Sequence, residues 1–252
     1  MELSAINSHP RDELIEFKEI GHLYTIDNVS KHPISVTTLV GNFWDKFDPE
    51  SVSARIVNSG KMQDPLYKYY GMSQEEIIKD WSSNTAAALG TEMHLKIELF
   101  YEGKLAKIEY PNTHEFYLFL KFHNDFHKIN YEYEPYRTEW VIYDNLGRVA
   151  GSIDMTYINS NGDIVIFDWK RVEKLDDWYR KYGKGPLSHM KDTKFNHYAI
   201  QLNCYRHILE TCYGKTIVGM YLGVFHPNNT GYMVREVTRM EEEINNIWDT
   251  LT

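Results

Sequence analysis

The chain has 252 residues and a formal net charge of −9, from 27 Lys and Arg against 36 Asp and Glu. Hydrophobic residues make up 42%, aromatic residues 14% and charged residues 25%, which excludes a disordered, collagen-like or linker-type chain and allows a sizeable core without disulfide or zinc staples. The acidic balance argues against a nucleic-acid partner unless basic residues are concentrated in one place.

The cysteines and the apolar segments indicate the compartment. Cys204 and Cys212 form no CxxC pair and no disulfide framework, which favours a reducing environment. No run of about 18 apolar residues exists to cross a membrane, and the first residues have neither a signal-peptide nor a transit-peptide pattern. We therefore expect a soluble, intracellular protein with no membrane partner, in the cytoplasm, the nucleus or a viral factory.

The first half of the chain is predicted to contain a hairpin and helices. Apolar and polar residues alternate over 13–27 on either side of a turn, as in a hairpin. Ser35 is a favourable N-cap for a helix over 35–47, which ends before Asp48-Pro49. Further helical patterns cover 50–58, 73–82, 84–101 and 113–128.

From Tyr131 onward the pattern changes from helical to alternating. Three successive strands are predicted over 138–144, 148–158 and 163–170, and after them a helix over 197–212, strands over 216–225 and 231–237, and a final helix over 239–251. This order predicts an α/β fold in which a mixed β-sheet is flanked by helices. Because no repeat or linker interrupts the chain, we expect one domain over 1–252, with a hairpin and helical subregion over 1–82 and a core over 83–252.

The chemistry-bearing residues are concentrated in the predicted three-strand meander. Asp154 lies in an otherwise apolar strand, and Asp168 and Lys170 end the next buried strand on the same face. A tight turn between paired strands would bring the two carboxylates together, where they repel each other and favour a cation such as Mg²⁺ or Mn²⁺. Lys170 would orient or deprotonate a water and steady charge on a phosphate. The plain alternative is a strand-end ion pair of Asp168 with Lys170 or Arg171.

Further polar residues accompany this pair. Gly90 and His94 lie on one predicted helix, and Gln201 and Tyr205 share a face of another. Glu139, near the start of the first meander strand, is either a further metal-site carboxylate or a salt-bridge partner, and both interpretations stay open. By contrast, His123 and His127 have zinc-ligand spacing but no evident third ligand, so we interpret them as part of a polar helix face.

Four motifs, in order, resemble those of the PD-(D/E)XK nuclease superfamily in its RecB-like branch. They are GxxxH at 90–94, GxxD at 151–154, DxK at 168–170 and QxxxY at 201–205. The branch includes CRISPR-associated RecB-like nucleases and the mitochondrial genome maintenance exonuclease. The resemblance implies a restriction-endonuclease-like core and a metal-dependent DNA nuclease that hydrolyses phosphodiester bonds in repair, recombination or replication.

The resemblance also implies roles for individual residues. The metal would be held by His94, Asp154, Asp168 and the backbone carbonyl of Trp169, and Lys170 would complete the catalytic set. Gln201 and Tyr205 would contact DNA or brace the site. The sequence departs from the family in three ways. It lacks the cysteines of the iron–sulfur members, so no such cluster is expected, and Arg171 stands where a small hydroxyl residue is common. The proline of the superfamily's name is also missing before Asp154, as is often the case in this branch.

A basic, aromatic segment answers the objection raised by the net charge. Residues 170–194 contain eight basic and four acidic residues, and Trp178, Tyr179, Tyr182 and Phe195 lie within or beside them. Basic residues interleaved with aromatic ones suit a single strand, through phosphate contacts and base stacking. The candidate DNA contacts here are Arg171, Lys174, Arg180, Lys181, Lys184 and Lys194. A solvated loop is the alternative for each of them.

The sequence is compatible with three functions. The leading hypothesis is an exonuclease on DNA that is single-stranded or has frayed ends, with Mg²⁺ or Mn²⁺ as cofactor. An RNA endonuclease of the cap-snatching type shares a similar arrangement of His, acidic residues and Lys, although the QxxxY motif argues for the RecB-like branch. A non-catalytic nucleic-acid-binding module with a relic nuclease site is the third.

Overall fold

The computed structural model groups the chain into two compact units, Met1–Trp44 with Glu92–Thr252 and, separately, Asp45–Thr91. It describes residues 2–18, 20–21, 23–82, 85–106, 110, 112–178 and 180–251. The expectation of a single nuclease domain over 1–252 stays a prediction. Within the described parts of the chain, no helix is long and apolar enough to cross a membrane.

The smaller unit is built from short helices. Its elements are α3 (Pro49–Val57), a 3₁₀ turn (Gly60–Gln63) and α4 (Gln74–Ser82), so the helices predicted over 50–58 and 73–82 are confirmed. Asp48 caps α3 by accepting a hydrogen bond from the Ser51 amide at 3.1 Å. The indole of Trp81 donates to the Tyr69 hydroxyl at 2.9 Å, which ties α4 to the preceding loop.

The larger unit contains a six-stranded mixed sheet. Its strands are β3 (Ile34–Ser35), β4 (Glu134–Tyr143), β5 (Val149–Ile158), β6 (Asp163–Lys170), β7 (Thr216–Val224) and β8 (Met233–Glu236). Strands β4, β5 and β6 form an antiparallel meander. Strand β6 then pairs with β7 in parallel, β7 pairs with β8 antiparallel, and β3 pairs in parallel with the start of β5.

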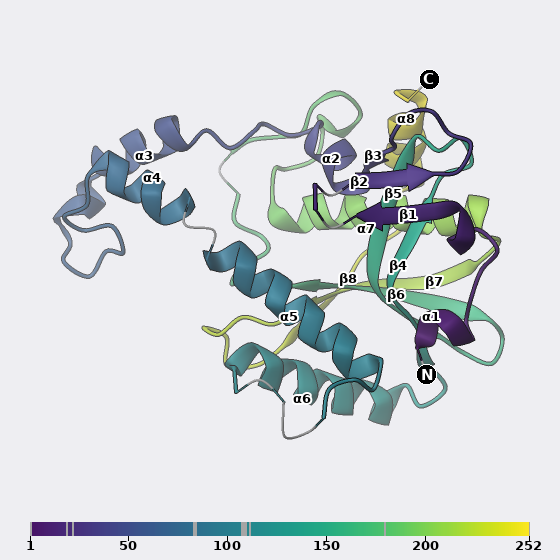
Figure 1. The fold of residues 1–252 in the computed structure, drawn as a ribbon. Coiled ribbons are helices and arrows are strands. Elements are labelled where there is room, and N and C mark those ends of the chain that lie inside the picture. The colour runs from purple at the N-terminus through teal and green to yellow at the C-terminus, as the bar shows by residue number, and fades with distance from the viewer. Residues whose placement is uncertain are drawn as a thin grey trace. The chain divides into compact units, whose positions relative to one another are not determined.

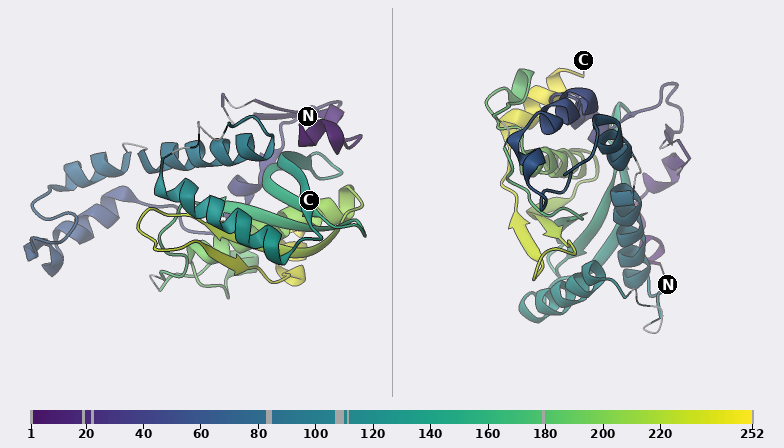
Figure 2. Two further views of the ribbon diagram at one scale, coloured as in Figure 1. Left: turned by 90° about the horizontal axis from the view of Figure 1, so that it is seen from below. Right: turned by 90° about the vertical axis from the view of Figure 1, so that its left-hand side faces the viewer.

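Helices cover both faces of this sheet (Figures 1 and 2). One face is packed by α5 (Thr85–Tyr101) and α6 (His114–Ile129), and the other by α2 (Val36–Gly41), α7 (Lys194–Cys212) and α8 (Glu241–Asp249). Two separate apolar cores result, one on each face. The predicted α/β class, a mixed sheet flanked by helices, is confirmed. The N-terminal residues add α1 (Leu3–Ile6) and the hairpin β1 (Ile15–Lys18) and β2 (Leu23–Ile26).

Two details differ from the sequence-based expectations, and a third expectation lies partly outside the described residues. The helix predicted over 35–47 ends at Gly41, because Gly41-Asn42 is a weak helix former and Trp44 turns inward to stack on His197 with ring centroids 4.2 Å apart. The hairpin is confirmed as strands, but residues 19 and 22 of its predicted turn lie outside the described residues. The short strand β3 is not anticipated by any pattern.

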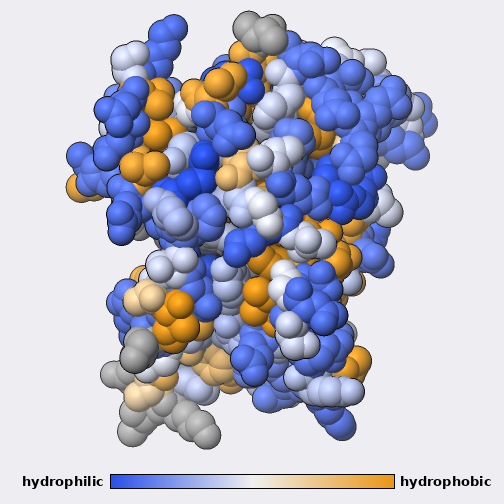
Figure 3. Space-filling view, turned by 90° about the vertical axis from the view of Figure 1, so that its right-hand side faces the viewer, coloured by the Kyte–Doolittle hydropathy of each residue, from blue (hydrophilic) through white to orange (hydrophobic). Residues whose placement is uncertain are grey.

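The two histidines of α6 lie against an aromatic cluster, so the prediction of a polar helix face is wrong. His123 contacts the ring of Phe100 with centroids 4.8 Å apart and hydrogen-bonds the Tyr101 hydroxyl at 3.2 Å. His127 contacts the His123 ring edge-on at 4.5 Å. Elsewhere the surface is largely polar, and Figure 3 shows one face on which hydrophobic residues gather only in limited patches.

The environment of His123 predicts a loss of stability in acid. Burial, and then the neighbouring His127, lower the pKa of His123 to about 4. The unfolded chain therefore binds a proton on this residue as the pH falls below its ordinary value of about 6.5, while the folded chain does not. We expect this group to contribute about 1 to 2 kcal/mol of lost stability between pH 6.5 and 4, after allowance for solvent screening.

Urea unfolding at several pH values measures this contribution. The variant His123→Gln should show a shallower fall in the free energy of unfolding below pH 6.5. The matched control is His114→Gln, on the exposed surface of the same helix, which should follow the wild-type curve. An unchanged slope in His123→Gln would contradict the assignment.

Candidate metal centre

Three carboxylates form a row across three neighbouring strands. Glu139 of β4 lies opposite Asp154 of β5, and the same register continues to Asp168 of β6. The flanking pairs that set this register are Thr138 with Met155, Trp140 with Ile153, and Met155 with Phe167. Because opposite residues on neighbouring strands point to the same face, the fold concentrates negative charge at this position.

The sheet opens where this row crosses it. Strand β5 pairs with β6 over 155–158 and with β3 at 149–150, and the ladder of described pairs on that side does not include 151–154. There the Trp169 amide donates a hydrogen bond to Oδ2 of Asp154 at 2.6 Å. The Asp154 carboxylate thus accepts the hydrogen bond that a backbone carbonyl of β5 would accept in a regular ladder. This bond fixes the Asp154 side chain against the end of β6.

His94 of α5 completes the group from above the sheet edge. Its Nε2 lies 2.9 Å from the carbonyl oxygen of Trp169, and because a carbonyl only accepts, Nε2–H is the donor. Nδ1 of the neutral ring then carries a lone pair, and it faces Oδ2 of Asp154 at 3.5 Å. The arrangement directs two acceptor atoms toward each other, as two ligands of one cation would be.

Glu139 occupies its place in a strained backbone conformation. Its φ is +41°, in the left-handed region that costs a residue with a side chain on the order of 1 kcal/mol or more. Its carboxylate accepts a hydrogen bond from the Ser152 hydroxyl at 2.9 Å. Burial, and then the charge of Asp154, raise the pKa of Glu139 to about 8. A partly buried, strained carboxylate beside another one is costly for stability alone.

These observations fit a metal site. Ligand atoms of His94, Glu139 and Asp154 all lie within 4.8 Å of one another, so one ion can be held by an imidazole and two carboxylates. The carbonyl of Trp169 accepts the hydrogen bond from Nε2–H of His94 at 2.9 Å and so lies beside this group. A divalent cation here would also let all the carboxylates ionise together.

Asp168 is the most deeply buried member of the row, and it lies outside the set of mutually close ligand atoms. Its carboxylate forms an ion pair with Lys170 Nζ at 2.6 Å and accepts a hydrogen bond from Gln201 at 3.2 Å. Burial raises the pKa of Asp168 to about 6, although Lys170 acts to lower it. The pair therefore holds a carboxylate and an ammonium at fixed positions next to Asp154.

Lys170 keeps its proton in this environment. Burial alone would lower the pKa of its ammonium, but the carboxylates of Asp168 and Asp154 outweigh burial and raise that pKa. The ring of Tyr198 lies below the ammonium, 4.6 Å from Nζ to the ring centroid. Lys170 is thus a positioned cation rather than a proton acceptor. Of the roles that the sequence suggests for it, this favours orienting a water and steadying charge on a phosphate over deprotonating the water.

Gln201 and Tyr205 of α7 point into the protein. Gln201 donates to both Asp168 and the Tyr205 hydroxyl, at 3.2 and 3.0 Å, and the Tyr205 side chain is 3% exposed. A Cβ atom on Gly151 would lie 2.6 Å from Cε1 of Tyr205, so the glycine of the GxxD motif provides the space for this ring. The GxxD and QxxxY motifs are therefore joined by the packing of Tyr205 on Gly151. Tyr205 accepts a hydrogen bond from Gln201, and Gln201 in turn orients Asp168.

Replacing Gly151 by alanine is expected to destabilise the protein by about 2 kcal/mol, because the new methyl group overpacks Tyr205. Thermal and urea unfolding would measure the loss. Gly41→Ala is the matched control, since no atom lies within 4 Å of its Cβ position; its stability should be unchanged or slightly raised. Equal stability of the two variants would contradict the packing role.

The basic segment divides into internal and exposed residues. Arg171 forms an ion pair with Glu115 at 2.7 Å, and both side chains are largely buried. The exposed members are Lys174, Arg180, Lys181, Lys184 and Lys194. Trp178 and Tyr182 pack edge-on at 5.6 Å, and the Lys191 ammonium lies over the Trp178 ring at 4.7 Å. Tyr179 lies outside the described residues.

Sequence reasoning missed three contributors to the site. Ser152 donates to Glu139, Glu115 holds Arg171, and Tyr198 supports Lys170. The only available signal was for Ser152, which lies within the GxxD motif. Glu115 and Tyr198 are brought to the site by helix packing, which no local pattern encodes.

Comparisons with known proteins leave the family open. No family model matches the sequence, and no curated protein matches it. Among solved structures, the chain is similar to SSO0001, with 14% identity and a TM-score of 0.35 over 89% of this chain and 78% of that one. It is also similar to a candidate exonuclease from Eubacterium rectale, with 13% identity and a TM-score of 0.36 over 86% of this chain and 68% of that one.

Proposed function

We propose that this protein is a metal-dependent nuclease of the RecB-like PD-(D/E)XK type, acting on DNA that is single-stranded or has free ends. The observation that carries the proposal is the fixed row of Glu139, Asp154 and Asp168 with His94 on one side and Lys170 on the other. Each of the four sequence motifs that resemble this superfamily supplies at least one residue or bracing contact to this group.

The proposed ligands follow from the donor set. Asp154, Glu139 and His94 would hold Mg²⁺ or Mn²⁺ with the carbonyl of Trp169, and Asp168 would contribute from the adjacent strand. Carboxylate and carbonyl oxygens suit these hard cations, and imidazole is compatible with Mn²⁺. When bound, the ion supplies Lewis acidity toward a phosphoryl oxygen and lowers the pKa of a coordinated water.

The residues around the ligands would position the reactants. Lys170, held by Asp168, places a permanent positive charge where a phosphodiester gains negative charge as a fifth oxygen attacks phosphorus. Gln201 and Tyr205 keep Asp168 oriented and so keep Lys170 in place. The hydrogen bond from the Trp169 amide keeps the Asp154 carboxylate aimed at the same point.

The exposed basic residues would guide the substrate. Lys174, Arg180, Lys181, Lys184 and Lys194 lie in the segment that continues from the end of β6 to the start of α7. Phosphate contacts by such residues attract a strand independently of its sequence and weaken with salt. Because Gln201, Tyr205 and Arg171 are buried or ion-paired, we assign them to bracing the site and the exposed lysines and Arg180 to DNA contact.

A pair of labelled oligonucleotides of one sequence, one of DNA and one of RNA, tests the substrate class. Each is incubated with the protein in Mn²⁺, in Mg²⁺ and with a chelator. We expect cleavage of the DNA strand that requires a metal and is at least about tenfold faster than that of RNA. Faster cleavage of RNA would support the cap-snatching type, and binding without cleavage of either strand would support a relic site.

A further inference from the structure

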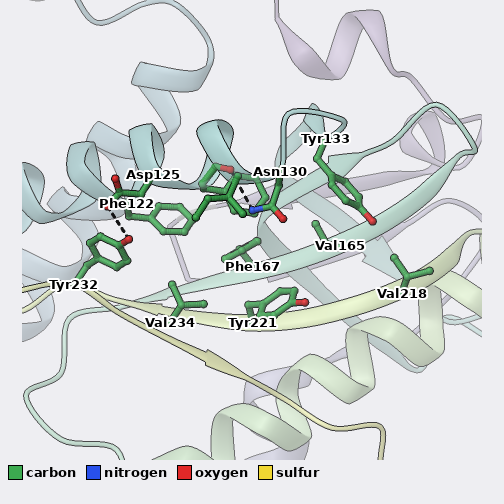
Figure 4. A pocket seen from close by; sticks show the side chains of 12 residues that line it. Phe122, Asp125, Asn130, Tyr133, Val165, Phe167, Val218, Tyr221, Tyr232 and Val234 are labelled. Atoms are coloured by element: carbon green, nitrogen blue, oxygen red, sulfur yellow. Dashed lines mark hydrogen bonds between the residues drawn. The ribbon is translucent and has the colours of Figure 1, made fainter.

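A groove lies on the sheet face that carries Phe167 and Trp169, the face opposite to the Asp168 carboxylate. It has a volume of about 540 Å³ and is bounded by α6 on one side and by β6, β7 and β8 below (Figure 4). Helices α5 and α6 pack against the meander part of this face. Helices α5 and α6 form a layer on this face, and the groove is the space beside α6 that one more helix in that layer would fill.

The walls of the groove form a stripe suited to a helix. On α6, Phe122, Asp125, Phe126, Ile129 and Asn130 line it at helical spacing, over a length of about 12 Å. The floor is formed by side chains of β6, β7 and β8. Apolar side chains are left open to solvent here, with Ile129 72% exposed, Val218 53% and Val234 37%. Such an aromatic and aliphatic channel is typical of grooves that accept the apolar side of an amphipathic segment.

Carboxylates surround this apolar channel. Asp125 accepts a hydrogen bond from the Tyr232 hydroxyl at 2.9 Å at one end of the groove. Glu236 is paired opposite Tyr221 across β7 and β8, so both side chains lie on the groove face. Asp163 shares the face of Val165 and Phe167 along β6. None of the twelve lining residues is Lys or Arg.

The electrostatic surroundings of the groove tyrosines agree with this arrangement. Burial is the main cause that raises the pKa of Tyr133, and the charge of Asp163 raises it further. For Tyr221, burial and then the charge of Glu236 raise the pKa in the same way. A phosphate backbone would be repelled by this rim, whereas a cationic partner would be attracted. The charge therefore separates this surface from the basic segment beside the metal centre.

We propose that this groove is the docking site for a basic amphipathic segment of a partner protein, which lays its apolar side chains on Val218, Val234 and Ile129 and its Lys or Arg side chains against Asp163 and Glu236. The inference does not depend on nuclease activity, because the groove and the row of carboxylates occupy opposite faces of the sheet.

Fluorescence anisotropy with designed peptides tests the proposal. The probe is a labelled amphipathic peptide of about 15 residues with Leu on one face and Lys on the other, long enough to form a helix. Its matched control is the same peptide with Glu in place of Lys. We expect the Lys peptide to bind the full-length protein at least about tenfold more tightly than the Glu peptide.

Variants of the protein locate the binding surface. Val218→Gln, at a position 53% exposed, removes an apolar contact, and Glu236→Lys places a like charge opposite the peptide. Each should weaken binding of the Lys peptide at least about tenfold. Leu146→Gln, at a position 66% exposed in the turn between β4 and β5, should leave it within about twofold. Circular dichroism spectra would verify that each variant is folded.

Several outcomes would overturn the proposal. Equal binding of the two peptides would exclude charge complementarity, and unchanged binding by Val218→Gln would exclude the groove. A wild-type dimer in sedimentation that Val218→Gln dissociates would assign the groove to a second copy of the chain. Binding of a DNA strand that Val218→Gln abolishes would assign it to nucleic acid.

Discussion

Replacing Asp154 by asparagine is expected to lower the rate of Mn²⁺-dependent cleavage on the order of a thousandfold. The substitution keeps the shape of the side chain, and an amide oxygen can still accept the hydrogen bond from the Trp169 amide. It removes the negative charge at the centre of the ligand set and so weakens both metal binding and the stabilisation of the transition state. End-labelled DNA and calorimetric titration with Mn²⁺ measure the two effects separately.

The matched control for this variant is Asp163→Asn, which changes the same functional group on β6 outside the site. Its cleavage rate and Mn²⁺ affinity should equal those of the wild type. Both variants should also unfold at similar urea concentrations, because neither loses packing. A wild-type rate in Asp154→Asn would show that this residue holds no catalytic metal.

The second large effect is expected when Lys170 is replaced by methionine. The Asp168 carboxylate, 1% exposed, would then be buried without its cation. Breaking one side of a buried ion pair typically costs about 3 kcal/mol or more, so the free energy of unfolding should fall by about that amount. The cleavage rate should fall about a hundredfold in addition, whereas Mn²⁺ should still bind because the ligands are intact.

A double variant isolates the structural role of Lys170. Combining Lys170→Met with Asp168→Asn removes both charges, and most of the lost stability should return. The cleavage rate should stay low, because the cation next to the phosphate and the Asp168 carboxylate are both missing. Recovery of the rate together with stability would show that cleavage needs neither the Lys170 ammonium nor the Asp168 carboxylate.

The meander was predictable because its pattern is local. Alternation and turn residues place three strands over 138–144, 148–158 and 163–170, and the observed strands β4, β5 and β6 differ by a few residues at most. Turn length then fixes which residues are opposite one another. The proximity of Asp154 to Asp168 could therefore be inferred, and their register supports it.

Other parts of the site depend on contacts that no pattern reveals. The interpretation of Glu139 stayed open because its direction depends on a left-handed backbone at one strand position. The orientation of Gln201 toward Asp168 depends on how α7 packs on the sheet, and the pairing of Arg171 depends on α6. Both helices were predicted, but the faces they present to the sheet were not. The early end of α2 likewise follows from the inward turn of Trp44.

The acidic net charge is also clearer in three dimensions. Glu139, Asp154 and Asp168 account for part of it at the candidate metal centre, and Asp125, Asp163 and Glu236 for part around the groove. The exposed basic residues occur together between β6 and α7. A single overall charge therefore conceals two surfaces with opposite preferences, which is why composition alone argued against a nucleic-acid partner.

Digestion of a linear and a circular single strand of the same DNA sequence tests the central claim most directly. The protein is incubated with each strand in Mn²⁺, and the release of labels from the 5′ and 3′ ends of the linear strand is followed separately. We predict that the linear strand is degraded from an end, that the circle is spared, and that a chelator or Asp154→Asn stops the reaction. Absence of cleavage in both Mg²⁺ and Mn²⁺, or cleavage that continues in the chelator, would contradict the account.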